Sequence, residues 1–446
     1  MTALHDSLSA QGVHTLIAQF TDLHGVARGK FVPLHQLDLL LSDGVGFAGP
    51  SIWGTGLPRT GPRSEYYGRG DAKASENVRA LPWMPGYARI VCDGFVANAP
   101  FDACPRQVLR RQIKRLNQRG WTLRTGIEPE FFLLQKTANG YAPFDANDQL
   151  HKPSYDLKSL PRQRQYLKQL ADGLVACGLD VFQIDHEDAH GQFELNFHHA
   201  DALTSADNLM LFKMAAHELA EQHGMVFSMM PKPFANQPGS GMHFHVSMWD
   251  GAGPGAKCVF EDESGSHGVS PLAQHFIAGV LHHSAALCAL AAPTVNSYKR
   301  LTVGESISGT TWAPAYVAHG PNNRTALVRT LHSRHTDCRG AAGACAHRSR
   351  AQASGAERGC GGRHAQSAVA VGPYSRYIQT HYERSTNASL PIFFLARAAG
   401  CVAVLVWRDA GAGEPGRGVV DVVGSDCDSG HCSVARCAAW PRSDAI

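Results

Sequence analysis

Alternating apolar and polar residues near the start of the chain predict a β-hairpin. The hairpin is expected over residues 13–33, with the segment HTLIAQFTD, a turn at 23–25 and the segment VARGKFVP. Such alternation is typical of strands, whose successive side chains point to opposite faces. We therefore expect residues 1–100 to form a small β-rich domain. Within it, the polar and glycine-rich stretch 59–77 is expected to be a loop.

Apolar residues spaced three and four apart predict helices further along the chain. One helix is expected to begin near Asp102 and to end at Gly120. Further helices are expected near 161–177, over 205–223 and over 271–291.

Three apolar segments between these helices carry ionisable side chains. They are GIEPEFFLL at 126–134, FQIDHEDAHGQFELNF at 182–197 and GMHFHVSMW at 241–249. Each is predicted to be a strand, the second spanning about 180–197. Because strand side chains alternate, Glu128 and Glu130 should point the same way, and His243 and His245 should share a face.

The acidic residues of these segments suggest a cation site. Glu128, Glu130, Glu187 and Glu194 brought together with an imidazole would repel one another unless a cation lay among them. Mg²⁺ and Mn²⁺ are the hard divalent cations that prefer such oxygen-rich ligands. Each segment alone is better explained by solvated glutamates and buried histidines. Their joint occurrence in apolar sequence favours a bound cation instead.

Composition limits the other possibilities. A chain of 446 residues should form at least two domains. With 41 basic and 38 acidic residues, no nucleic-acid partner is indicated. No apolar run reaches the roughly 18 residues needed to cross a bilayer, and the start lacks the layout of a signal peptide. We expect a cytoplasmic enzyme that does not contact membranes.

The composition changes abruptly after residue 331. The segment 332–446 contains 7 of the 12 cysteines, many arginines and no lysine, with glycine-rich pieces such as GAAGAC. It shows little amphipathic periodicity between 332 and 372. A divergent C-terminal domain is one explanation. The alternative that we favour is a reading-frame change in a GC-rich gene.

Six motifs resemble the glutamine synthetase family over roughly residues 12–331. They are FTDLHG at 20–25, GIEPEFFLL at 126–134, HEDAHGQFE at 186–194, GSGMHFHVS at 239–247, NSYKR at 296–300 and NNRTALVR at 322–329. The segments GFAG at 46–49 and DHEDAHGQFE at 185–194 resemble the bacterial branch that includes γ-glutamylmethylamide synthetases more than the main ammonia-using group.

This resemblance implies an α+β fold with two domains. A small N-terminal β-grasp-like domain would comprise residues 1–100. A large catalytic domain, an antiparallel sheet flanked by helices, would comprise 101–331. The tail 332–446 matches no part of the family. The resemblance also implies a homo-oligomer, a dodecamer of two stacked hexameric rings with active sites between neighbouring subunits.

The activity implied is that of an ATP-dependent ligase. Such an enzyme joins ammonia to the γ-carboxyl of glutamate through a γ-glutamyl phosphate intermediate. Carried over by motif, Glu130, Glu187 and Glu194 would hold one Mg²⁺ or Mn²⁺, and Glu128 and His243 the second. Arg300 and the loop at Gly239 would bind glutamate, with Arg324 also facing substrate. His245, Ser247, Arg324 and Arg329 would contact the nucleotide, and Arg300 and Arg324 would serve catalysis.

Two of three departures from the family pattern leave the function open; the third is that Ser306, with Glu305 one residue early, stands where the family has a glutamate. Ala48 stands where ammonia-using members have an acidic residue, which favours an alkylamine such as methylamine as the alternative nucleophile. The family's next motif, with a metal-binding glutamate and an arginine two residues later, is absent after Leu331. A protein that binds nucleotide and metal without turnover is therefore a further alternative. A manganese hydrolase is a weaker one, because it leaves Arg300 and Arg324 unexplained.

Overall fold

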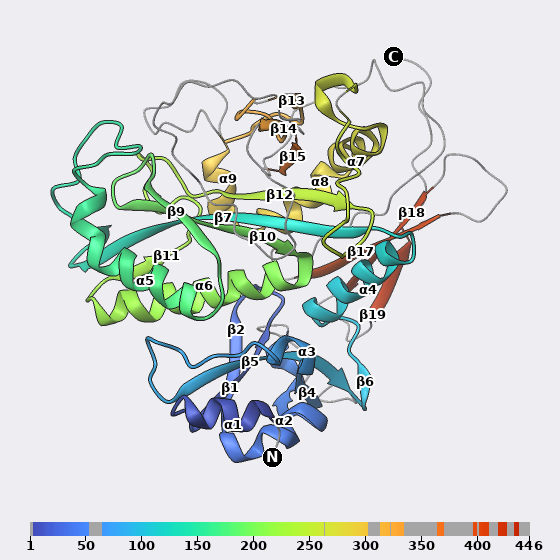
Figure 1. Ribbon diagram of the computed structural model, residues 1–446. Coiled ribbons are helices and arrows are strands. Elements are labelled where there is room, and N and C mark those ends of the chain that lie inside the picture. The colour runs from blue at the N-terminus through green and yellow to red at the C-terminus, as the bar shows by residue number, and fades with distance from the viewer. Residues whose placement is uncertain are drawn as a thin grey trace, which may run out of the picture.

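The computed structural model describes residues 3–52, 65–262, 264–301, 313–321 and 323–333, together with five later strands. A sheet with three helices forms the N-terminal end of the molecule, and a larger sheet flanked by helices forms the rest (Figure 1). The expected α+β class is confirmed. The boundaries at residues 100 and 331 stay predictions.

The predicted hairpin opens the N-terminal sheet. Strands β1 (Thr15–Thr21) and β2 (Ala27–Pro33) pair antiparallel, and Gly25 in their turn has a φ of +70°. The sheet order is β2-β1-β5-β4-β3, with β6 paired to β5. The other elements are β3 (Val45–Ala48), β4 (Glu65–Gly70), β5 (Tyr87–Val96), β6 (Ala99–Pro100), α1 (Ala3–Ala10), α2 (Leu37–Ser42) and α3 (Ala72–Ser75).

The loop expected over 59–77 is partly wrong. Residues 53–64 lie outside the described part, but residues 65–75 contain β4 and α3. Tyr66 is fully buried against Phe20, and the Asp71 carboxylate caps α3 by accepting from the Lys73 and Ala74 amides. The sequence prediction missed β4 because every second residue of this strand is polar and at least partly exposed, which makes the segment resemble a loop.

The larger sheet has the order β13-β14-β15-β12-β7-β10-β9, with β8 and β11 also paired to β7. Its strands are β7 (Thr122–Thr137), β8 (Gly140–Pro143), β9 (Val181–His186), β10 (Gln192–Asp201), β11 (Val226–Ser228), β12 (Met242–Trp249), β13 (His319–Pro321), β14 (Val328–Ser333) and β15 (His364–Val369). The single acidic strand expected over 180–197 is instead the hairpin of β9 and β10. The chain reverses between them, where Gly191 has a φ of +70°.

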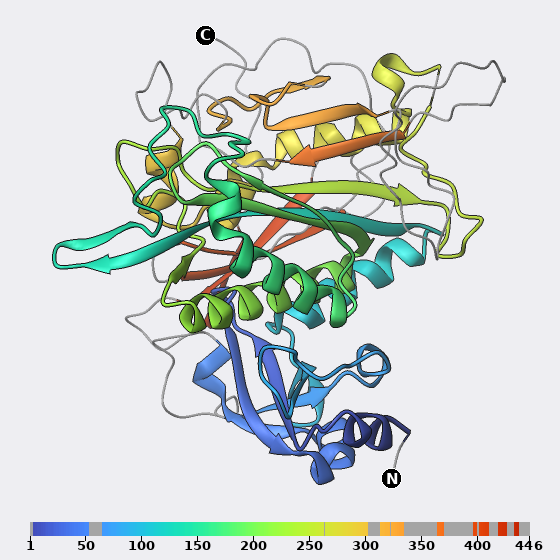
Figure 2. The same cartoon turned by 60° about the vertical axis from the view of Figure 1, so that its left-hand side comes forward.

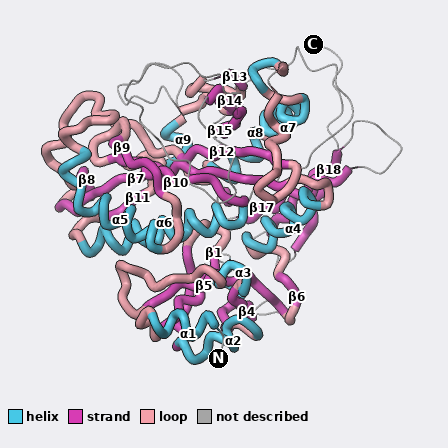
Figure 3. The backbone as a smooth tube through the Cα atoms, in the orientation of Figure 1, coloured by secondary structure: helices cyan, strands magenta, loops and turns pink. Residues whose placement is uncertain are grey.

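Helices α5 and α6 cover one face of this sheet (Figure 3). Helix α6 begins earlier than expected because Asp201 caps it, whereas the Ser205 hydroxyl donates to the carbonyl of Thr125. The helix expected over 271–291 divides at His283. The bounds are α4 (Pro105–Asn117), α5 (Arg164–Ala176), α6 (Ala202–Gln222), α7 (Pro271–His282), α8 (Ser284–Ala291) and α9 (Val295–Arg300).

Alternation along the central strands separates a core face from a polar face. Ile127, Phe131 and Leu133 of β7 pack with Phe193 and Leu195 of β10 in the core beneath α5 and α6. The residues between them in sequence therefore point to the opposite face. That face carries the acidic side chains of both strands.

The tail contributes strands in two places. Strand β15 lies between β12 and β14 in the large sheet, whereas β16 to β19 form a separate four-stranded sheet (Figure 2). Their bounds are β16 (Ala396–Ala398), β17 (Cys401–Asp409), β18 (Gly418–Ser425) and β19 (Cys432–Arg436). In the described part of the chain, no helix has the length and apolar character to cross a membrane.

Candidate active site

Strand pairing brings the acidic segments together on the polar face of the large sheet. In the register, Glu128 of β7 lies opposite His243 of β12. On its other side β7 pairs with β10, so that Glu130 lies opposite Glu194. Glu194 in turn lies opposite Asp185 of β9. We call Glu128, Glu130, Asp185, Glu187 and Glu194, with His243 and His245, the acidic cluster.

Glu128 contacts both histidines of β12. Its Oε1 lies 2.8 Å from His245 Nε2, and its Oε2 lies 3.4 Å from His243 Nδ1. Burial raises the pKa of the Glu128 carboxyl, but the two imidazoles outweigh it and hold that pKa well below the usual range. At neutral pH, the Glu128 carboxyl is therefore ionised.

Glu187 and Glu194 are in the opposite electrostatic situation. Burial and the neighbouring charges of Glu130 and Asp185 raise the pKa of Glu187 to about 9. Burial, then Glu130 and Glu128, raise the pKa of Glu194 well above its usual range. These two carboxyls therefore need either protons or a cation to neutralise them.

Glu130 has partners of its own. Its Oε2 accepts from the Gly241 amide at 2.8 Å and from Gln192 Nε2 at 3.0 Å. Glu194 Oε1 likewise accepts from Asn196 Nδ2 at 3.0 Å. These donors fix the direction of each carboxylate and leave other oxygen lone pairs open to a ligand.

Ligand atoms of the acidic cluster form two groups of a size suited to a cation. Glu128, Glu194 and His243 offer atoms within 4.8 Å of one another, and so do Asp185, Glu187 and Glu194. Oxygen donors with one imidazole are the set that Mg²⁺ and Mn²⁺ accept. The donor set thus fits the implied cations.

The sequence prediction missed Asp185, which stands with Glu187 and Glu194 where Glu130 was expected. Its spacing could have revealed it, because Asp185 and Glu187 are two residues apart at the end of one strand segment. Gln192 was also missed. Its side chain contacts Glu130 only because β7 and β10 are neighbours.

Arg300 approaches the cluster from the end of α9. Its Nε donates to the carbonyl of Gly239 at 3.4 Å. A Cβ built on Gly241 would lie 2.6 Å from Arg300 Nη2 and 3.0 Å from Glu130 Oε1. The loop at 239–241 therefore requires glycine at 241 to admit the guanidinium beside Glu130.

The residues expected to contact the nucleotide are divided between two strands and a turn. Ser247 is buried on β12, and its Oγ accepts from Trp249 Nε1 at 2.9 Å. Arg329 of β14 is buried. Burial and the charge of Arg324 lower the pKa of Arg329, whereas Glu128 and Glu194 raise it. Arg324 lies in the exposed turn before β14.

Strand β15 occupies the place beside His245. Ala368 pairs with His245 on one side and with Arg329 on the other, so these two residues share one row of the sheet. The β15 segment, HAQSAV, contains no carboxylate. The three glutamates of the tail, at 357, 383 and 414, lie outside the described residues.

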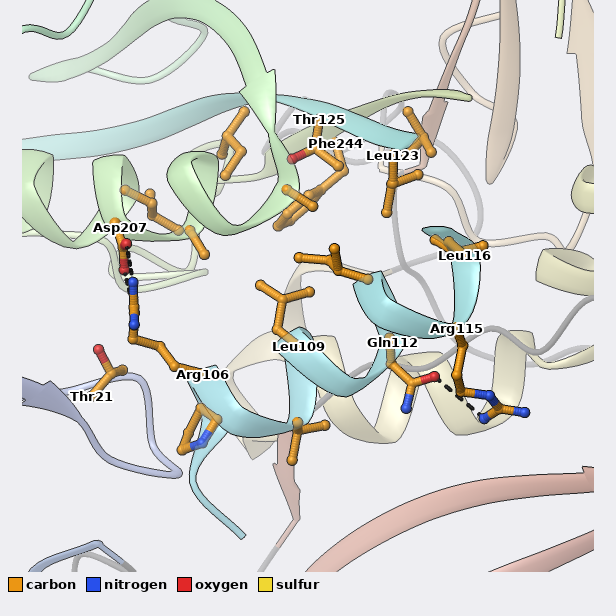
Figure 4. A pocket seen from close by; sticks show the side chains of 18 of the residues that line it. Thr21, Arg106, Leu109, Gln112, Arg115, Leu116, Leu123, Thr125, Asp207 and Phe244 are labelled. Carbon is orange, nitrogen blue, oxygen red and sulfur yellow. Dashed lines mark hydrogen bonds and ion pairs between the residues drawn. The ribbon is translucent and has the colours of Figure 1, made fainter. Parts of the chain in front are cut away.

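A cavity of about 600 Å³ lies on the other face of the sheet, away from the acidic cluster. Figure 4 shows it between α4, α6 and the strands, with Leu109, Leu116, Leu123 and Phe244 lining it. Its lining is mainly apolar and includes none of the predicted site residues.

Comparisons with known proteins point to one family. A family model described as the catalytic domain of glutamine synthetase matches residues 102–344. The glutamate–methylamine ligase of Methyloversatilis universalis is 48% identical over 325 residues, 72% of each chain. Glutamine synthetase of Rhizobium meliloti is 38% identical over 319 residues, covering 72% of this chain and 71% of that one.

Solved structures give the same assignment. A GmaS/ADP complex in conformation 1 aligns with a TM-score of 0.67 at 38% identity, over 74% of each chain. An apo GmaS without ligand aligns with a TM-score of 0.65 at 36% identity, over 74% of this chain and 73% of that one. The chain therefore belongs to the glutamine synthetase family, and it is a glutamate–amine ligase of that family.

Proposed function

We propose that this protein is an ATP-dependent ligase that joins a small alkylamine, methylamine foremost, to the γ-carboxyl of glutamate. The observation that carries the proposal is the 48% identity to a glutamate–methylamine ligase, against 38% to a glutamine synthetase over a similar span. Ammonia, the expectation from family resemblance, becomes the second candidate. The expected nucleophile is thus changed from ammonia to the alternative, an alkylamine.

The reaction has two steps. A glutamate γ-carboxylate oxygen attacks the γ-phosphorus of ATP, giving an acyl phosphate and ADP. The amine nitrogen then attacks the acyl carbon, phosphate leaves, and the nitrogen loses a proton. The first step is needed because a carboxylate is a poor acyl donor. Charge neutralisation around the transferred phosphoryl group is the main contribution that the protein can make.

Several side chains are suited to this chemistry. The Arg300 guanidinium can bind a substrate carboxylate with two parallel hydrogen bonds, which lysine cannot. Arg329 can face the phosphates from the strand row that it shares with His245. Glu128, Glu194 and His243, and the group around Glu187, would hold the two cations. When bound, these cations would supply the positive charge that phosphoryl transfer needs.

Ala48 supports the alkylamine. It ends β3 and is exposed in the N-terminal sheet, a different sheet from that of the acidic cluster. In the ring expected from family resemblance, this edge would meet the active site of a neighbouring subunit. A methyl group there leaves an uncharged pocket, which suits the carbon of an alkylamine better than an ammonium ion.

The tail should limit turnover. By family resemblance, a glutamate and an arginine should follow Leu331, and no carboxylate stands in β15 beside His245. Loss of an arginine that compensates phosphoryl charge can lower a rate by about 10³–10⁵. We therefore expect the chain to be a poor ligase as it stands.

A chimera tests both parts of the proposal. Residues 332–446 are replaced by the C-terminal segment of the glutamate–methylamine ligase, and kcat/KM is measured for methylamine and ammonia. We expect the chimera to be active and to prefer methylamine. Ala48→Asp should shift its preference towards ammonia, whereas the uncharged Ala48→Ser should leave the preference unchanged.

Two outcomes contradict the proposal. A chimera that strongly prefers ammonia before any substitution rules out the alkylamine. Ordinary turnover by the unaltered chain, with a kcat of about 1–10³ s⁻¹, shows that its tail is functional.

A further inference from the structure

A fully buried histidine–aspartate pair lies directly behind the acidic cluster. His186 has no exposed surface, and Asp148 is 4% exposed. His186 Nε2 lies 2.8 Å from Asp148 Oδ2. Neither residue belongs to the predicted site, and the proposed reaction uses neither. A buried pair of this kind is weak evidence for stability alone, so its contacts deserve a functional explanation.

Both nitrogens of the His186 ring face acceptors. Nδ1 lies 2.8 Å from the backbone oxygen of Glu187, and Nε2 faces the Asp148 carboxylate. The His186 ring therefore bridges the Asp148 carboxylate and the backbone carbonyl of Glu187.

Asp148 also holds the far end of the same turn. Its Oδ2 accepts from the Gly191 amide at 2.6 Å, while its Oδ1 accepts from the Ser159 hydroxyl at 3.0 Å. One carboxylate therefore connects both ends of residues 187–191, which we call the Glu187 turn. A Cβ on Gly191 would lie 3.0 Å from the Leu133 carbonyl oxygen, so the turn packs closely on β7.

The Glu187 turn is also linked to Glu130 of β7 through the side chain of Gln192. The Ala189 amide donates to Gln192 Oε1 at 3.0 Å, and Gln192 Nε2 donates to Glu130 Oε2 at 3.0 Å. A shift of this turn would therefore displace Glu187 directly and Glu130 through one side chain.

We infer that Asp148 and His186 are positioning residues that hold the Glu187 turn in the conformation that binds a divalent cation. The inference rests on the metal site of the proposed function. Carboxylates whose direction is fixed by hydrogen bonds behind them bind metal with less ordering cost. Removing such a supporting partner commonly weakens metal binding by about 10–100-fold.

The test measures Mn²⁺ affinity of the full-length protein, with free Mn²⁺ followed by its electron paramagnetic resonance signal. His186→Phe keeps the ring contact with Phe193 but removes both hydrogen bonds. We expect it to weaken Mn²⁺ binding at least about tenfold. Tyr166→Phe is the matched control, because it removes a buried hydrogen bond to the Ala216 carbonyl on the core face. Its Mn²⁺ affinity should equal that of the wild type.

Three results separate the possibilities. Wild-type affinity in His186→Phe, with lost affinity in Glu187→Ala, overturns the positioning role and leaves the metal site intact. Unchanged affinity in Glu187→Ala overturns the metal site itself. If His186→Phe does not fold, Asp148→Asn decides. We expect it to lose at least about threefold in affinity, since it removes the carboxylate that contacts His186, Gly191 and Ser159. Equality with wild type overturns the inference.

Discussion

Two groups of carboxylates in this protein differ in how their negative charge is balanced. Asp71, Asp93 and Asp207 surround Arg106, which is 6% exposed and lies 2.6–3.0 Å from an oxygen of each. Arg110 adds contacts to Asp71 and Asp93. We call these five residues the arginine cluster. It joins the N-terminal sheet to α4 and α6 through charges that the chain itself supplies.

Among the described residues, the acidic cluster lacks enough neighbouring cations to balance all of its carboxylates. Burial raises the pKa of Asp71, but the Arg106 and Arg110 contacts outweigh it and lower that pKa. At Glu187, burial and the neighbouring carboxylates both raise the pKa. Carboxylates paired within the chain hold domains together, whereas those left unbalanced are suited to an exchangeable cation.

Breaking the arginine cluster should give the largest effect. Arg106→Ala leaves three largely buried aspartates short of a cation. Loss of one partner of a buried ionic group costs about 3–5 kcal/mol. We expect the free energy of unfolding to fall by this amount, as measured by urea denaturation followed by tryptophan fluorescence. Arg111→Ala, at an exposed ion pair with Asp102, is the control and should stay within about 0.5 kcal/mol.

Arg300 places a guanidinium beside Glu130 of the acidic cluster. Arg300→Lys keeps the charge but removes the two-pronged contact that we propose for a substrate carboxylate. Glutamate binding should weaken by about 1.5–3 kcal/mol, the range for a charge-assisted hydrogen bond. Calorimetry should show little change for ATP. An unchanged affinity for glutamate would mean that the substrate binds elsewhere.

Neutralising the acidic cluster should have the reverse effect on stability from breaking the arginine cluster. Mn²⁺ at ten times its Kd should stabilise the wild type by about 1.4 kcal/mol, because ligand binds only the folded state. The double variant Glu187→Gln with Glu194→Gln should lose this gain, yet be at least as stable as the wild type without metal. Thermal unfolding with and without Mn²⁺ measures both. A destabilised metal-free variant contradicts the comparison.

The smallest expected effect is the release of a proton from the acidic cluster when Mn²⁺ binds. A carboxyl with a raised folded-state pKa contributes stability that is present below its unfolded pKa of about 4.3 and is lost as the pH rises through about 9. Metal-free Glu187 therefore holds a proton at pH 7, and Mn²⁺ must displace it. Calorimetry in buffers of different ionisation enthalpy should show on the order of one proton released. Glu187→Gln should reduce this number, whereas Asp71→Asn should not change it.

The sequence by itself determined the elements and the chemistry of this protein. Period-two alternation identified the hairpin at the start and the strands that carry Glu128 and His243. Helical periodicity identified α4 and α5 to within a few residues. Six local motifs identified the family. All of these signals are local, because side-chain alternation and short motifs depend only on neighbouring positions.

Only the tertiary structure decided which of these residues meet. Strand order and register put Asp185 opposite Glu194 and place the Asp148–His186 pair behind the Glu187 turn. The sequence hid the reversal between β9 and β10, since Gly191 resembles any other glycine until its φ is known. Pairing between distant strands is set by which faces can be buried together. That choice depends on the whole chain and leaves no periodic trace in either segment.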